Sequence, residues 1–142
     1  LATGSQRRNF ELKSSHLGAL FGCFGGKVVC ADDGLFERGR GKPHPDIFLV
    51  AAERFLGREV GMGEAGESAV SEAQRAIRAK GLVFEDGIPG VQAGKRAVVW
   101  VPDANLVALG AEATSVDEQP DATLKSLEDF VPEEWGLPPY DS

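Results

Sequence analysis

The feature that most constrains the fold is a short apolar run that ends in two carboxylates and leads into a helix start. Residues 81–86 read Gly-Leu-Val-Phe-Glu-Asp, and Gly-Ile-Pro-Gly-Val-Gln-Ala-Gly follows. A continuous apolar run is typical of a buried parallel strand, and ligands bind where such strands end. Carboxylate oxygens there suit Mg²⁺, so Glu85 and Asp86 are candidate metal ligands. The alternative is a pair of solvated acids that caps the next helix.

Short apolar strands alternate with helical patterns along the whole chain. Strands are expected at 1–3, 27–31, 82–84, 98–101 and, at a sheet edge, 122–124. Helices are expected at 6–20, 45–56, 71–80, 88–97, 105–111 and 126–130, the first with Phe10, Leu12, Leu17 and Leu20 on its buried side. This alternation predicts a single α/β domain with a parallel sheet.

Bulk composition excludes several classes of protein. The chain has 142 residues and a net charge of −7, which argues against general nucleic-acid binding. No apolar run is long enough to span a membrane. Two cysteines, Cys23 and Cys30, give neither a disulfide framework nor a zinc pattern, so a cytoplasmic location is expected.

Charge is distributed unevenly between the two ends of the chain. The stretch from Asp103 onward holds ten acids and one base, whereas residues 1–102 carry a net charge of +2. This asymmetry fits a phosphate site in the front part, and it fits equally a solvated acidic C-terminus.

One lysine lies in an unusually stiff segment. Lys42 stands in Gly-Lys-Pro-His-Pro-Asp, residues 41–46, just before a predicted helix. A fixed positive charge is what a phosphoryl group needs in its transition state. Lys42 is therefore a candidate catalytic residue, with an ordinary loop lysine as the alternative.

The N-terminal strand ends in a small polar turn. Thr3, Gly4 and Ser5 place hydroxyls and backbone N–H groups at a helix start, where phosphate oxygens can bind. Helix capping by Ser5 explains the same residues.

Two glycine-rich patterns do not indicate nucleotide sites. Gly61-Met-Gly-Glu-Ala-Gly66 matches G-x-G-x-x-G but follows a helix and contains an acid. In Gly25-Gly-Lys-Val28, valine replaces the Ser or Thr of a P-loop. A response-regulator-like domain is also disfavoured, because the acid pair follows the lysine loop.

Three pieces in this order resemble motifs II, III and IV of the haloacid dehalogenase (HAD) superfamily. They are Thr3 at a strand end, Lys42 in GKPHPDIF, and Glu85-Asp86 in LVFEDGIPGVQAG. The segments ATGSQRRNFELK, KPHPDIFLVAAERF, VVWVPDANL and SLEDFVPEEWGLPPY are similar to those of its pseudouridine-5′-phosphatase-like and sugar-phosphatase-like group. The resemblance implies a Rossmann-like three-layer core.

The resemblance also implies roles for these residues. Thr3, helped by Gly4 and Ser5, would bind phosphoryl oxygens, and Lys42 would neutralise their charge. Asp86 would ligate Mg²⁺, with Glu85 beside it. The implied activity is a phosphatase for a small phosphorylated metabolite that reacts through an aspartyl-phosphate.

The chain departs from the family pattern in three places. No D-x-D motif, the source of the nucleophile and the acid/base, occurs in it. The link from residue 97 to the strand at 98–101 lacks the usual short loop. Residues 57–80 exceed the usual loop length and are expected to be a surface insertion, and residues 131–142 an irregular tail. Residues 1–142 are thus expected to be a partial core without the central strand and the helical cap.

The absent central strand has physical consequences. Strands 1–3 and 27–31 would lie on one side of the gap, and strands 82–84 and 98–101 on the other. Unpaired edges invite association with another chain. The isolated chain is therefore expected to be unstable, to self-associate through those edges, or to pair strands 1–3 and 82–84 directly. A truncated, non-catalytic protein that binds phosphate or a partner is the alternative function.

Overall fold

The computed structural model describes residues 1–63, 69–94, 97–108 and 119–140. Its strands are β1 (Ala2–Thr3), β2 (Val29–Cys30), β3 (Val83–Glu85), β4 (Val98–Trp100) and β5 (Ala122–Thr123). Its α-helices are α1 (Arg7–Ser14), α2 (Gly18–Phe21), α3 (Asp46–Leu56), α4 (Glu72–Arg78), α5 (Ile88–Gly94) and α6 (Ala104–Ala108). Short 3₁₀ helices are η1 (Gly22–Phe24), η3 (Leu127–Asp129) and η4 (Pro132–Trp135). The predicted α/β architecture is confirmed.

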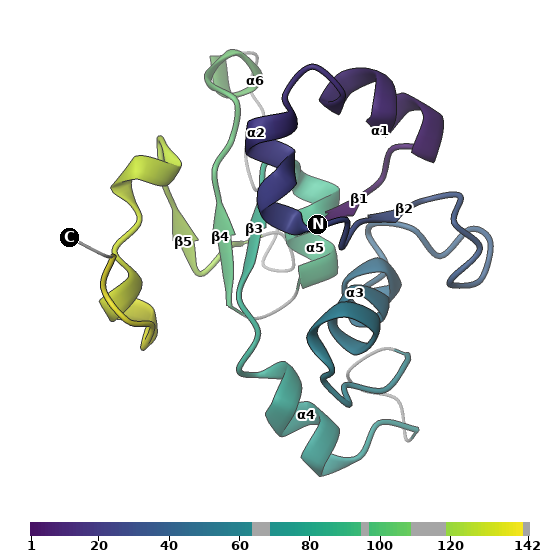
Figure 1. The fold of residues 1–142 in the computed structure, drawn as a ribbon. Helices are drawn as coiled ribbons and strands as arrows, with labels where there is room; N and C mark the ends of the chain where they lie inside the picture. Colours follow the sequence, from purple (N-terminus) through teal and green to yellow (C-terminus); the bar gives the residue numbers. More distant parts are fainter. Residues whose placement is uncertain (64–68, 95–96, 109–118, 141–142) are drawn as a thin grey trace.

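The strands form two separate parallel sheets (Figure 1). One contains β1 and β2, and the other has the order β3-β4-β5, with β5 at an edge as predicted. The strands expected on each side of the missing central strand are therefore present. The expectation that strands 1–3 and 82–84 pair directly is wrong for the described residues, because β1 pairs with β2 and β3 with β4.

The free edge of β1 is occupied by a side chain. The N–H of Val29 donates to the Leu1 carbonyl, so alternation along the strand turns the Ala2 carbonyl away from β2. The Lys42 ammonium donates to that carbonyl at 3.3 Å. A lysine therefore lies where direct pairing with β3 would place a strand.

The long N-terminal helix expected over 6–20 is broken into α1, α2 and η1. The Ser14 hydroxyl donates to the Phe10 carbonyl within the helix, a side-chain bond that competes with the regular helical pattern. The predicted buried side is also wrong, because Leu12 is 67% and Leu20 61% exposed, and Leu17 is exposed as well. Of the predicted face only Phe10 is half-buried, with its ring edge-on to Phe21 of α2 at 5.5 Å between centroids.

Helix α3 packs on the β1–β2 sheet and forms its core. Ile47 and Val50 contact Val29, and Phe36 and Phe55 close the cluster. Gly57 ends the helix in a left-handed conformation with φ 61°, which glycine adopts without strain. The guanidinium of Arg40 forms a bidentate ion pair with the buried Asp46 in the first turn, at 2.7 and 2.9 Å.

The segment expected as a surface insertion is anchored to the core. Val60 and Val70 are buried, so its described part does not lie wholly at the surface. The guanidinium of Arg78 donates to three backbone carbonyls, those of Val60, Gly61 and Gly63, at 2.7 to 3.0 Å. Two carbonyls of the glycine-rich pattern, those of Gly61 and Gly63, thus accept hydrogen bonds from one arginine.

Helix α5 packs closely on β3 and β4. A side chain at Gly94 would lie 2.5 Å from Val98, so glycine permits this approach. In the described residues the helix spans Ile88–Gly94, and Ala97 has φ 60° just before β4 begins. Residues 95–96 of the short junction noted in the sequence lie outside the described residues.

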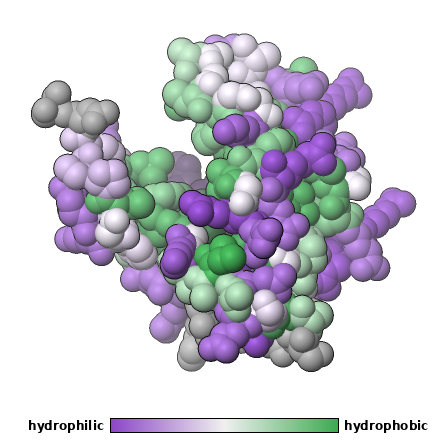
Figure 2. Space-filling model, turned by 60° about the horizontal axis from the view of Figure 1, so that its bottom comes forward, coloured by the Kyte–Doolittle hydropathy of each residue, from purple (hydrophilic) through white to green (hydrophobic). Residues whose placement is uncertain are grey.

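The C-terminal segment packs on the β3–β5 sheet through aromatic rings. Phe130 lies edge-on to Phe84 of β3 at 4.8 Å between centroids, and 6.4 Å from Trp135. Apolar surface remains in a hollow beside this C-terminal lobe (Figure 2). In the described part of the chain, no helix is long and apolar enough to cross a membrane.

Candidate functional site

Lys42 and Glu85 form an ion pair that joins the two sheets. Lys42 precedes α3, and Glu85 is the last residue of β3. The Lys42 ammonium contacts the Glu85 carboxylate and the carbonyl of Ala2, and lies 5.0 Å from the centroid of the Phe48 ring. The side chains are only 16% and 7% exposed. The structure therefore brings the predicted lysine motif to the ends of both β1 and β3.

A glycine on α5 makes room for the Glu85 carboxylate. A Cβ atom at Gly90 would lie 2.0 Å from the Glu85 Oε2 atom. Desolvation raises the pKa of Glu85, while the hydrogen bond and charge of Lys42 oppose this shift. The carboxylate is thus held in a nearly dry niche with one cation beside it.

Asp86 differs from its neighbour in environment. Its side chain is exposed, and it follows the end of the β3 ladder. Its backbone carbonyl accepts a 2.9 Å hydrogen bond from the indole N–H of Trp100 on β4. The predicted pair is therefore one buried, ion-paired carboxylate and one that faces solvent.

The turn at Thr3, Gly4 and Ser5 lies at the end of β1, as predicted. The N–H of Ser5 donates to the Thr3 hydroxyl oxygen at 3.1 Å. The N–H of Arg7, at the start of α1, donates to the Asp32 carboxylate at 2.7 Å. The helix N-cap is Gln6 without a side-chain bond, so capping by Ser5 is not observed. A phosphoryl group would need other donors here, such as the Thr3 hydroxyl hydrogen and the Gly4 N–H.

An ion pair that the sequence reasoning missed holds this turn against β2. The Arg7 guanidinium binds the Asp33 carboxylate and the Val28 carbonyl, and Asp33 also accepts from the N–H of Cys30 at 2.8 Å. Desolvation is the largest single influence on Asp33 and raises its pKa, but the hydrogen bonds from Arg7 and the Cys30 N–H, with the charges of Arg7 and Arg54, together lower the pKa below its ordinary value. The sequence contained a signal for this ion pair, because Asp32 and Asp33 follow an apolar run just as Glu85 and Asp86 do.

The carboxylates fit Mg²⁺ in chemical kind. Within the described ranges, no group of three or more His, Cys, Asp or Glu side chains could hold a metal ion. Glu85 and Asp86 supply hard oxygen donors, and Mg²⁺ is usually bound by one or two carboxylates together with water and substrate phosphate. Two carboxylates suffice for that mode, although Glu85 already contacts Lys42.

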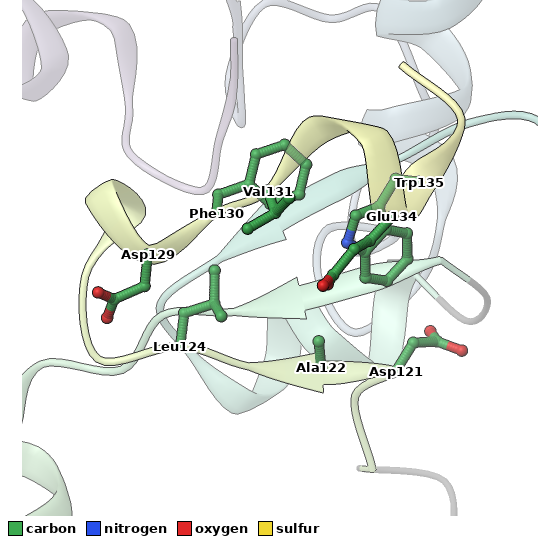
Figure 3. Close-up of a pocket in the computed structure, with 8 residues that line it drawn as sticks. All are labelled: Asp121, Ala122, Leu124, Asp129, Phe130, Val131, Glu134 and Trp135. Carbon is green, nitrogen blue, oxygen red and sulfur yellow. The ribbon is translucent and has the colours of Figure 1, made fainter. Parts of the chain in front are cut away.

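A cavity of about 270 Å³ lies elsewhere, between β5 and the C-terminal segment (Figure 3). Ala122 and Leu124 point into it from the strand side, beneath Val131 and Trp135. Its lining includes three acids, Asp121, Asp129 and Glu134. These carboxylates would repel a phosphate, and none of the predicted site residues lines the cavity. A second hollow, of about 530 Å³, is lined by Leu35, Phe36, Glu37, Arg40, Asp46, Met62 and Gly63, again without those residues.

Comparison with known proteins identifies relatives across nearly the whole chain. It is 39% identical to an Arabidopsis thaliana protein named (DL)-glycerol-3-phosphatase 2, over 99% of this chain and 50% of that protein. It is 40% identical to a Drosophila melanogaster protein named "Probable pseudouridine-5′-phosphatase", over 99% and 51%. It is 37% identical to the Arabidopsis thaliana bifunctional riboflavin kinase/FMN phosphatase, over 99% and 30%. These relatives point to the HAD-like phosphatase superfamily.

This result confirms the family predicted from the three motifs. No protein-family model matches the chain. The chain spans about half the length of the curated relatives it matches. Lys42 meets the strand ends that carry Thr3 and Glu85, and a functional proposal can rest on this arrangement.

Proposed function

We propose that this chain supplies part of the active site of a Mg²⁺-dependent phosphatase that acts on a small phosphorylated metabolite. The observation that carries the proposal is the Lys42 ammonium, which contacts both Glu85 of β3 and the Ala2 carbonyl beside Thr3. One cation thus connects the three motifs at the ends of two parallel strands. The proposed substrate class is a sugar phosphate or a nucleoside phosphate; the relatives are named for glycerol 3-phosphate and pseudouridine 5′-phosphate, both small phosphorylated metabolites.

The nucleophile is proposed to come from outside this chain. The backbone N–H of Val83 bonds to Ala97 and the Glu85 carbonyl to Val101, so the polar groups of Phe84 between them face away from β4. The Ala2 carbonyl likewise faces away from β2. A parallel strand inserted between β1 and β3 would pair with these two outward edges once the Lys42 ammonium left the Ala2 carbonyl, and a carboxylate at its end would lie beside Lys42.

The chemistry follows from that placement. The external carboxylate forms a bond to phosphorus as the bond between phosphorus and the substrate oxygen breaks, with a proton supplied to the leaving alcohol by an external acid. Water then cleaves the aspartyl-phosphate and releases inorganic phosphate. Lys42 offsets negative charge on the phosphoryl oxygens, and the Thr3 hydroxyl and the N–H of Gly4 donate to them. Ser5 contributes through the turn it forms with Thr3.

Asp86 and Glu85 are the residues proposed to hold Mg²⁺. Asp86 is exposed and free to bind directly, whereas Glu85, already beside Lys42, would act directly or through water. Bound by these carboxylates, Mg²⁺ would shield the repulsion between an anionic nucleophile and the anionic phosphate.

Assays of two forms of the protein test this proposal. The chain of residues 1–142 and the natural protein that contains it with its upstream sequence are each assayed with p-nitrophenyl phosphate and Mg²⁺. We expect negligible turnover from the chain alone. We expect turnover from the longer protein, lost in Asp86→Asn and in Lys42→Met and retained in the surface control Lys80→Met. Turnover by the chain alone that Asp86→Asn abolishes would place the nucleophile within it and contradict the proposal.

A non-catalytic HAD-like protein is the second candidate, favoured by the absence of a D-x-D motif from the 142 residues. Such a protein would bind phosphate weakly or contact a partner, and the unpaired edges of β1 and β3 offer a route to self-association. Reading the coding sequence upstream of Leu1 separates the two candidates. An apolar strand that ends in D-x-D supports the enzyme, and its absence supports the binding protein.

A further inference from the structure

The Trp100 side chain, on the neighbouring strand β4, donates a hydrogen bond to the backbone of the turn that is proposed to bind Mg²⁺. Trp100 is the last residue of β4 and lies opposite Glu85 in the strand register. Its ring packs with Val91 and Val98 in the core, and the residue is only 7% exposed. The indole ring is therefore largely buried in the core formed by α5 and β4.

The indole N–H of Trp100 adds a hydrogen bond between β4 and the chain after β3, just beyond the last backbone hydrogen bond between the two strands. The last ladder bond between these strands runs from the N–H of Val101 to the Glu85 carbonyl at 2.7 Å. The next carbonyl, that of Asp86, accepts from the Trp100 indole at 2.9 Å. A buried indole N–H requires an acceptor, and this one is on the residue proposed to bind Mg²⁺.

We infer that Trp100 is a positioning residue for Asp86. Its hydrogen bond fixes the peptide plane between Asp86 and Gly87, and with it the direction in which the Asp86 carboxylate leaves the turn. This inference rests on the proposed function, because it assumes that Asp86 is a metal ligand. Without the bond the exposed turn samples more conformations, and the carboxylate must be ordered again whenever the ion binds.

The inference is tested by measuring Mg²⁺ binding to the natural protein that contains this chain. Calorimetry measures the binding, and the indole ¹H–¹⁵N NMR signals are recorded with and without Mg²⁺. Trp100→Phe keeps the aromatic packing and removes the N–H, and Trp135→Phe is the matched control in the C-terminal segment. We expect Trp100→Phe to raise the Kd for Mg²⁺ about tenfold, the scale typical of partners that orient a metal ligand. We expect Trp135→Phe to leave the Kd unchanged. In the unsubstituted protein, Mg²⁺ should shift the indole signal that Trp100→Phe removes.

A merely structural role for Trp100 would lower the melting temperature and leave the Kd for Mg²⁺ unchanged well below that temperature. An unchanged Kd in Trp100→Phe, or an equal rise in Trp135→Phe, would overturn the inference. Asp86→Asn distinguishes this failure from failure of the proposed site. If Asp86→Asn abolishes Mg²⁺ binding while Trp100→Phe does not weaken it, only the inference is wrong. If Asp86→Asn binds Mg²⁺ normally, the metal site is wrong, and the inference with it.

Discussion

Removing the charge of Lys42 should show how much the Lys42–Glu85 ion pair contributes to the stability of the folded protein. The Lys42 and Glu85 side chains are 16% and 7% exposed, so the pair is largely out of water. In Lys42→Met the carboxylate keeps its burial and loses its cation. Breaking a buried pair in this way typically costs 3–5 kcal/mol. Because Glu85 can take up a proton instead, we expect the lower end, about 3 kcal/mol at pH 7.

The loss should depend on pH in a definite direction. The pKa of Glu85 is already raised in the folded protein, above a reference of 4.5, by desolvation, and Lys42 opposes that shift. Without Lys42 the folded-state pKa rises further. A group with a raised pKa contributes stability at low pH, and this contribution is lost as pH rises through the folded pKa. The cost of Lys42→Met should therefore shrink on acidification, by up to about 1.4 kcal/mol per pH unit between the two folded-state pKa values.

Urea unfolding of the protein, followed by circular dichroism at several pH values, measures these quantities. Lys80→Met, at an exposed lysine, controls for the general effect of losing a charge. Introducing Lys42→Met into a Glu85→Gln background should cost much less than 3 kcal/mol, because no buried charge is then left alone. A cost below about 1 kcal/mol at pH 7, or one that does not fall on acidification, would refute the reasoning.

Two further substitutions test the packing around the site. Gly90→Ala should destabilise the protein by about 1–3 kcal/mol, because the new Cβ atom would lie 2.0 Å from the Glu85 carboxylate. Gly18→Ala should be tolerated, because Gly18 has open space around it. Thermal unfolding of the two variants compares these effects. Arg78→Met should speed hydrogen exchange in residues 60–63, because three backbone carbonyls there lose their donor, and unchanged exchange would show that other contacts hold the segment.

Local chemistry was sufficient to predict the elements near the site. The apolar run before Glu85, the glycine and proline after it and the proline-rich segment around Lys42 each favour one backbone conformation. The parallel strands, the helix expected over residues 71–80 and the end of α3 at Leu56 follow from such signals. The unbroken first helix was predicted wrongly, because spacing shows which residues could share an apolar face but not whether anything covers it.

The sequence by itself determined which chemical groups this protein carries: a lysine in a stiff segment, two carboxylates after a strand and a hydroxyl turn after another. It also predicted the family that the relatives confirm. Only the tertiary structure decided how those groups meet. Burial beside α5 joined Glu85 to Lys42 and left Asp86 in solvent, and the Trp100 indole reached the Asp86 carbonyl. Such contacts depend on the packing of residues distant in the chain, which local patterns do not encode.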